Sequence, residues 1–178
     1  NVDLHATLAD FFDVSSEHVT HGQSLLPLIT GEKTSVREYA LGGIYGNWVQ
    51  INNGKHKYAR GPVGNNFPLS MFSNRWSTMP VPSYPGLRLP EPDQRARLDT
   101  MPGSSIPVIR QPFEPGDLLP FWTTNMPIDE HYLFDLGEDP TEANNLVGTQ
   151  REQVMLDALR TALGEIDAPT EQLARLGL

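Results

Sequence analysis

Apolar residues recur at helical spacing near the start of the chain. Four of them share the i, i+4, i+7, i+8 pattern of a helix with one apolar face: Leu4, Leu8, Phe11 and Phe12. Asp3 precedes them as a candidate N-cap. A second, shorter helix is predicted over residues 24–29, because Pro27 falls in its first turn and Gly31 supplies a stop.

Period-two patterning then predicts three strands, over residues 39–45, 48–52 and 55–60. Asn53 and Gly54 join the last two. Because this dipeptide readily takes positive φ at both turn positions, it predicts a β-hairpin. The third strand has side chains on two faces: His56, Tyr58 and Arg60 on one, and Lys55, Lys57 and Ala59 on the other.

A further strand is predicted after residue 130, with apolar residues at period-two spacing: Tyr132, Phe134 and Leu136. An acidic turn follows at Asp139 and Pro140, and then a short helical start that carries Asn144 and Asn145.

Two helices complete the pattern. Thr149 and Glu152 fit a capping box, in which each side chain satisfies a free backbone donor. The helix that they open carries five apolar residues on one side: Met155, Leu159, Ala162, Leu163 and Ile166. Pro169 ends it, and a last short helix is predicted over residues 170–176, closed by Gly177.

Residues 62–127 differ in composition from both flanks. They hold 13 of the 16 prolines, which breaks up long helices and central strands. They are also rich in large aromatic residues, which a disordered linker would lack: Phe67, Phe72, Trp76, Phe113, Phe121 and Trp122. We therefore expect an ordered, irregular excursion that packs onto another part of the protein, with one short helix within residues 88–98.

Length and composition narrow the class of protein. A chain of 178 residues is one domain or a large piece of one. The net charge of −9 argues against nucleic acid and anionic membranes as partners, because both attract a basic face. The absence of cysteine excludes disulfides, thiolate metal sites and a cysteine nucleophile within these residues.

The sequence does not indicate a cellular compartment. No apolar run approaches the ~20 residues that a membrane helix needs, so we expect a soluble protein. The chain starts Asn1-Val2-Asp3, with neither an initiator methionine nor a signal peptide. We interpret it as a fragment or a processed product, and its compartment stays open.

Four segments, taken in order, resemble motifs of one enzyme family. Residues 132–146 resemble the signature LYDL-x-x-DP-x-E-x-x-NL, and residues 3–8 resemble DL-x-PTLL with Ala6 at the usual proline. Residues 21–31 resemble G-x-SLLPLL-x-G, and residues 54–58 resemble G-x-x-KY. These are motifs of the sulfatases, which belong to the alkaline phosphatase superfamily.

The resemblance implies an arylsulfatase-like parent enzyme that hydrolyses sulfuric esters with a formylglycine nucleophile and Ca²⁺. In this family the nucleophile forms within C/S-x-P-x-R. The calcium ligands, and the lysine and histidine that bind sulfate, precede the DL-x-PTLL helix. All of them would lie upstream of Asn1, so the resemblance implies no catalytic residue, metal ligand or cofactor site in this chain.

Two segments come near the nucleophile motif. Residues 83–88 read SYPGLR and residues 105–110 read SIPVIR, with the arginine one position too late in both. One residue turns a side chain to the other face of an extended chain. We therefore treat both segments as coincidental.

Acids and histidines do not predict a metal site. The acids of the signature do not fit an EF-hand, and we expect them to cap a turn and a helix start: Asp135, Glu138, Asp139 and Glu142. The histidines form no helical i, i+4 pair, so we expect no zinc site from this chain alone: His5, His18, His21, His56 and His131.

Three residues are candidates for substrate binding: Arg75, Trp76 and Arg110. A guanidinium binds sulfate or carboxylate in bidentate fashion, and tryptophan stacks on an aromatic or sugar ring. In the structural alternative, which we favour, Trp76 packs the excursion onto the sheet and Arg110 pairs with a nearby acid.

The predicted fold is α+β, with an antiparallel sheet of about four strands and a packed C-terminal helix. By resemblance this is the C-terminal subdomain of a sulfatase, which closes one side of the active-site cleft. Residues 1–35 would be a helical junction from the large α/β domain, residues 36–61 and 128–178 the subdomain, and residues 62–127 the excursion. Without the large domain, the first helix would expose three apolar side chains and favour self-association: Leu8, Phe11 and Phe12.

Three functions stay open. The first is the C-terminal part of a sulfuric ester hydrolase, with the upstream catalytic domain as its partner and a small sulfate ester as substrate. The second is phosphonate monoester or phosphodiester hydrolysis within the same superfamily. The third is a non-catalytic binding or assembly module. The substrate and the oligomeric state, a homo-oligomer included, are not fixed by these residues.

Overall fold

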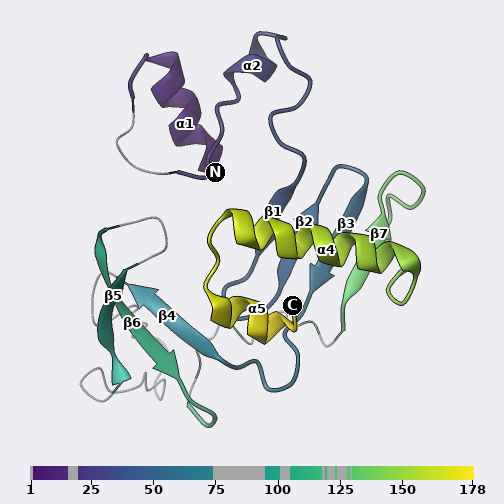
Figure 1. The fold of residues 1–178 in the computed structure, drawn as a ribbon. Coiled ribbons are helices and arrows are strands. Elements are labelled where there is room, and N and C mark those ends of the chain that lie inside the picture. The colour runs from purple at the N-terminus through teal and green to yellow at the C-terminus, as the bar shows by residue number, and fades with distance from the viewer. Residues whose placement is uncertain are drawn as a thin grey trace, which may run out of the picture. The chain divides into compact units, whose positions relative to one another are not determined.

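A computed structural model describes residues 2–15, 20–73, 95–100, 105–117, 119, 123, 128 and 130–178. The chain forms two compact units, Asn1–Ala40 and Leu41–Leu178, which are described one after the other (Figure 1). The predicted division at residues 35, 61 and 127 stays a prediction.

The first unit holds two helices, α1 (Val2–Phe11) and α2 (Leu26–Ile29). Asp3 lies inside α1, so its predicted role as the N-cap is wrong. Its carboxylate instead accepts from the backbone N–H of Gln23 (2.9 Å) and from the guanidinium of Arg37. Asp3 therefore holds later segments of the unit against the helix.

Neither α1 nor α2 has a buried residue among the residues that the structure describes in it. The predicted exposure of three apolar side chains is confirmed, because more than half of the surface of each is exposed: Leu8 and Phe11 in α1, and Phe12 directly after it. Polar contacts hold the unit together instead, including the bond from the Leu25 N–H to the Thr7 hydroxyl (2.9 Å).

The second unit contains the predicted four-stranded sheet. Its strands are β1 (Ala40–Gly43), β2 (Val49–Asn52), β3 (His56–Arg60) and β7 (Tyr132–Asp135), in the order β1-β2-β3-β7. β3 pairs antiparallel with both neighbours, with Tyr58 opposite Ile51 on one side and Leu133 on the other. These three residues share the face of the sheet that is fully buried.

The hairpin between β2 and β3 turns one residue later than predicted. The Asn53 N–H donates to His56 O (3.2 Å), which leaves Gly54 and Lys55 as the two turn residues. Gly54 has φ 87°, and positive φ at the first turn position alone is the pattern of a type II′ turn. The Asn53 side chain instead accepts from the N–H groups of Lys55 and His56, which fixes the turn from inside.

Helix α4 (Gln150–Glu165) covers one face of the four-stranded sheet and contacts β2 and β3 (Figure 1). The predicted apolar side is confirmed by the four helix residues that are buried: Met155, Leu159, Ala162 and Leu163. Ile166 is the C-cap and is only partly buried. A short helix, α5 (Thr170–Leu176), follows and ends at Gly177 with φ 64°, as predicted.

The predicted capping box at the start of α4 is wrong. The Thr149 hydroxyl donates to Leu146 O (2.7 Å) rather than accepting a backbone N–H of the helix. The Glu152 carboxylate accepts from the N–H of Gly148 (2.7 Å) and from the hydroxyl of Tyr58 (3.0 Å). A buried tyrosine across the helix–sheet interface therefore takes the carboxylate that the local pattern assigned to the cap.

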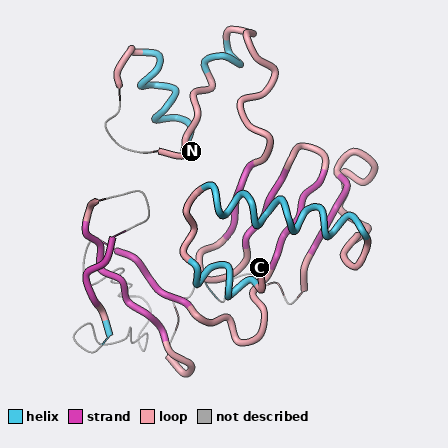
Figure 2. The backbone as a smooth tube through the Cα atoms, viewed as in Figure 1, coloured by secondary structure: helices cyan, strands magenta, loops and turns pink. Residues whose placement is uncertain are grey.

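The excursion contains a second sheet, with strands β4 (Leu69–Ser73), β5 (Arg97–Thr100) and β6 (Pro107–Phe113) in the order β4-β6-β5 (Figure 2). The expectation that proline prevents a central strand here is wrong. Among the described pairs, Pro107 lies opposite β5 alone and Pro112 opposite β4 alone. Pro107 is the first residue of β6 and Pro112 the last but one, and each lies where β6 has a neighbouring strand on one side only, so a missing N–H costs least.

Three residues form the buried core of the second sheet, Leu69, Met71 and Phe113, with Phe67 and Leu119 packed against them. This core lies within the excursion and includes two of its described aromatic residues, Phe67 and Phe113, and the packing of the excursion onto another part of the protein stays a prediction. Most of the short helix predicted within residues 88–98 lies outside the described residues, and its last two residues belong to β5 instead.

The fold is therefore α+β, with a four-stranded antiparallel sheet, a second sheet of three strands and two C-terminal helices. Within the part of the chain that the structure describes, helices are too short or too polar to cross a membrane.

Candidate functional site

The signature segment closes the free edge of the first sheet. β7 is the last strand, so its outer backbone groups have no neighbouring strand. The Asn145 side chain accepts from the N–H of Leu133 (3.0 Å) and donates to His131 O (3.0 Å). The Leu146 N–H donates to Leu133 O (2.8 Å). Asn145 and Leu146 therefore replace a fifth strand.

Residues 141–147 contain no helix, so the predicted helical start is wrong. Glu142 has φ 57°, which a right-handed helix does not allow, and the Asn145 side chain accepts from the backbone N–H of Val147 (3.2 Å). The Asp139 carboxylate accepts from the Asn144 N–H (2.7 Å) and the Thr141 hydroxyl (3.0 Å). Backbone N–H donors, first that of Asn144, hold the pKa of Asp139 below its ordinary value.

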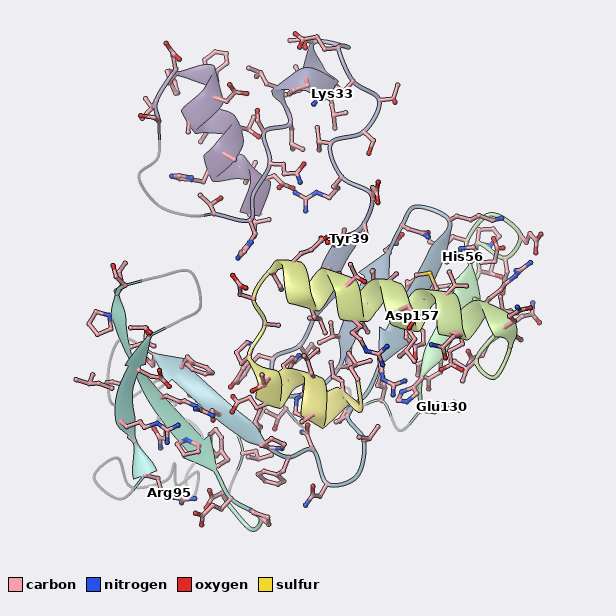
Figure 3. The ribbon with its side chains drawn as sticks, viewed as in Figure 1. Lys33, Tyr39, His56, Arg95, Glu130 and Asp157 are labelled. Atoms are coloured by element: carbon pink, nitrogen blue, oxygen red, sulfur yellow. The ribbon has the colours of Figure 1, made fainter. Side chains whose placement is uncertain are left out.

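Asp135 ends β7 at a convergence of positive groups. One carboxylate oxygen accepts from the N–H groups of Gly137 (3.1 Å) and Glu138 (3.2 Å). The other accepts from Arg151 Nη1 (3.1 Å) and lies 3.4 Å from His56 Nε2 (Figure 3). Desolvation acts to raise the pKa of Asp135, but these N–H donors and the nearby positive charges outweigh it and lower the pKa.

Asp135 and Asp139 thus cap turns, as predicted, but Asp135 is buried and pairs with cations, which was not predicted. Glu142 completes this picture, because its carboxylate accepts from Lys57 Nζ (2.5 Å) on β3. Among the described residues, no three histidine or acidic side chains converge to hold a metal ion. His18 lies outside the described residues.

We predict that Asn145→Ala lowers the free energy of unfolding by about 1–2 kcal/mol, because it removes side-chain hydrogen bonds and leaves Leu133 N–H and His131 O unpaired at the sheet edge. Urea unfolding followed by circular dichroism measures the change.

The matched control is Asn144→Ala, whose only side-chain bond in the described structure is a long one to Asp139 (3.3 Å). It should cost less than about 0.5 kcal/mol, as an exposed substitution does. Equal losses in the two variants would show that Asn145 does not protect the edge.

A buried polar network joins β3, α4 and α5. The Tyr58 hydroxyl donates to Glu152 and accepts from Arg60 Nη1 (2.9 Å). Burial raises the pKa of Tyr58 to about 12, so the phenol stays protonated at neutral pH. Arg60 Nε and Nη2 also donate to the carbonyl oxygens of Leu176 (2.6 Å) and Gly177 (3.2 Å), which anchors the end of α5.

Arg175 of α5 is fully buried. Its Nη1 donates to Asn47 O (2.5 Å) and Asn66 Oδ1 (2.8 Å), and its Nη2 donates to Gln172 Oε1 (2.8 Å). Desolvation lowers the pKa of Arg175, against the opposing charge of Glu171. This guanidinium therefore joins two loops to the last helix.

Arg110, a predicted substrate-binding residue, pairs with acids in the structure. Its Nη2 lies 2.6 Å from Glu171 Oε2 on α5, and its Nη1 lies 3.6 Å from Asp99 Oδ2 on β5. Its Nε also donates to the Ser70 hydroxyl (3.1 Å). These contacts agree with the structural alternative, in which Arg110 pairs with a nearby acid. Arg75 and Trp76 lie outside the described residues, and a substrate role for all three stays a prediction.

Ser70 and Glu171 share a hydrogen bond (2.9 Å), as a catalytic nucleophile and its base do, but Ser70 lacks the exposure that a nucleophile needs. Ser70 is almost fully buried, and Arg110 occupies a lone pair of its hydroxyl. A substrate therefore cannot reach the oxygen. These contacts join β4, β6 and α5.

Sequence reasoning missed Arg175 and the Ser70–Glu171–Arg110 contact. The strand pattern did place Tyr58 and Arg60 on one face. Tyr58 and Arg60 lie on the face that a helix covers, and this pairing was the feature of the sequence that indicated a buried polar network. No such signal exists for Arg175, because two of its partners, Asn47 and Asn66, lie 128 and 109 residues away in the sequence.

No protein-family model matches the chain, and a search of curated proteins found no match. The class that the fold defines is an α+β protein.

Proposed function

We propose that this chain is the C-terminal part of a sulfatase-like hydrolase, with the catalytic residues supplied by an upstream domain of the same protein. The observation that carries the proposal is the structural role of residues 132–146, which form the signature. Asn145 and Leu146, which match the sulfatase motif, bond to Leu133 and close the edge of the first sheet. Asp135 and Asp139, which also match it, accept from backbone N–H groups of the turns between β7 and Asn145. The motif thus corresponds to one structural unit and not to scattered matches.

Two further observations support it. The chain has a four-stranded antiparallel sheet covered by a helix, as expected of that subdomain. The exposed apolar face of α1 suits a helix that packs onto a larger domain, because a helix without buried residues gains little from its own unit. In this proposal Ca²⁺ and formylglycine belong to the upstream domain, and this chain shapes one wall of the cleft.

The test compares the 178-residue chain with the full product of the gene that encodes it, using an aryl sulfate as substrate. We expect no turnover by the chain alone and calcium-dependent turnover by the full product. Hydrolysis by the chain alone, or a gene product without a C/S-x-P-x-R motif upstream, would overturn the proposal. The second result favours a non-catalytic binding or assembly module.

The alternative within the superfamily is a phosphonate monoester hydrolase or phosphodiesterase. The same assay with matched aryl sulfate, phosphate diester and phosphonate monoester substrates separates these reactions. The ester with the highest kcat/KM identifies the substrate class, because this ratio measures transition-state binding.

A further inference from the structure

His131 connects the end of β3 to the start of β7. The backbone N–H of Gly61 donates to His131 Nδ1 (3.2 Å). An imidazole nitrogen accepts a hydrogen bond only while it carries no proton, so in the neutral ring the proton sits on Nε2. A protonated ring has donors on both nitrogens and cannot keep this bond.

The charged groups around His131 oppose its protonation as a set. Burial comes first in lowering the pKa of His131, the positive charge of Arg60 on β3 adds to this, and Glu152 on α4 opposes it. Tyr58, also on β3, joins Arg60 and Glu152 through its hydroxyl and remains neutral. Glu130 precedes His131 in the chain and is exposed.

The same Arg60 anchors the C-terminal helix. It donates to Leu176 O and Gly177 O, and nearby the Val63 N–H donates to Arg175 O (2.9 Å). A positive imidazole beside Arg60 repels this guanidinium and frees the Gly61 N–H at the same time. Both effects loosen the strand end to which α5 is tied.

We propose that His131 is an acid-sensitive latch, which in its neutral form holds the end of β3 and the C-terminal helix α5 in place and releases them when it takes up a proton. The proposal is independent of the proposed function, because it concerns contacts within the unit Leu41–Leu178.

The direction of the pH dependence follows from linkage. Because folding lowers the pKa of His131 below the ordinary 6.5, the folded chain binds fewer protons at this site than the open chain. The stabilisation is therefore complete above about pH 6.5 and is lost as the pH falls through the folded pKa. A single proton changes the opening equilibrium by at most about tenfold per pH unit.

Amide hydrogen exchange of the 178-residue chain tests the latch. Protection factors, which remove the intrinsic pH dependence of exchange, should fall below pH 6.5 at Gly61 and Val63. In His131→Asn, the amide oxygen stands one bond from Cγ, as Nδ1 does, and accepts without titrating. In this variant the protection factors at Gly61 and Val63 should not fall below pH 6.5. Both proteins retain His56, which lies near Asp135, so the comparison isolates position 131.

The control is His5→Asn on the exposed helix α1, which should keep the wild-type pH dependence. A wild-type profile that is flat between pH 7 and 5, or one that His131→Asn leaves unchanged, would overturn the proposal. Nitrogen-15 shifts of the wild-type imidazole supply a second readout that needs no variant. A neutral His131 with its proton on Nδ1 would also overturn it, because that nitrogen could not accept from Gly61.

Discussion

Arg175→Ala should lower the free energy of unfolding of the 178-residue chain by about 3 kcal/mol, the largest loss that we expect from any polar substitution. The guanidinium is fully buried and bonds to Asn47 O and to the side chains of Asn66 and Gln172. Its removal takes a donor from the buried Asn47 and from the partly buried side chains of Asn66 and Gln172, and the lost hydrogen bonds carry a desolvation cost. Urea unfolding at pH 7 measures the loss.

Two variants show whether the loss comes from the guanidinium. Arg175→Lys keeps the charge but replaces the planar fork by one ammonium, so it should recover only part of the stability. Arg160→Ala removes an arginine of α4 that pairs with Asp157 at 3.1 Å, with both side chains about half exposed. It should change stability by less than about 0.5 kcal/mol. Equal values for Arg175→Ala and Arg160→Ala would contradict the assigned role of Arg175.

Leu159→Ala should cost about 3 kcal/mol, because it opens a cavity between α4 and the first sheet. Leu159 is fully buried and belongs to the buried side of the helix, which faces a sheet with Ile51 and Leu133 in its core. Alanine is an even better helix former than leucine, so the loss would report packing and not helix propensity. Thermal or urea unfolding measures it.

Val154→Ala is the matched control on the same helix. Val154 is 66% exposed, and its truncation should stay within about 0.5 kcal/mol of the wild type. A loss at Val154 as large as that at Leu159 would mean that the wrong face of α4 had been assigned to the core.

Local patterns predicted the main elements because each depends on neighbouring residues. The spacing of Met155 and Leu159 set the buried side of α4, and alternation placed Tyr58 and Arg60 together. Predictions at the ends of helices were wrong where another group bonded to the side chain. Glu152 accepts from Tyr58 and Gly148 instead of forming the expected capping box, and Asn145 bonds to β7 instead of starting a helix.

The candidate site shows the same division. The role of the signature acids in turns could be predicted from the sequence, because Asp139 bonds to residues two and five positions away. The sequence did not contain the pairing of Arg110 with Glu171, which are 61 residues apart and come from the second sheet and the last helix. Proline content likewise suggested an irregular segment, whereas β6 tolerates its prolines at positions that only the sheet order defines.

By itself, the sequence determined the α+β class, the four strands of the first sheet and the apolar side of α4, because periodic patterns and turn residues act over a few positions. Only the tertiary structure decided which polar groups are buried together: Arg175 with Asn47 and Asn66, Arg60 with the end of α5, and His131 with Gly61. The physical reason is that a buried donor must find an acceptor wherever the folded chain supplies one, and distance along the sequence does not limit that choice.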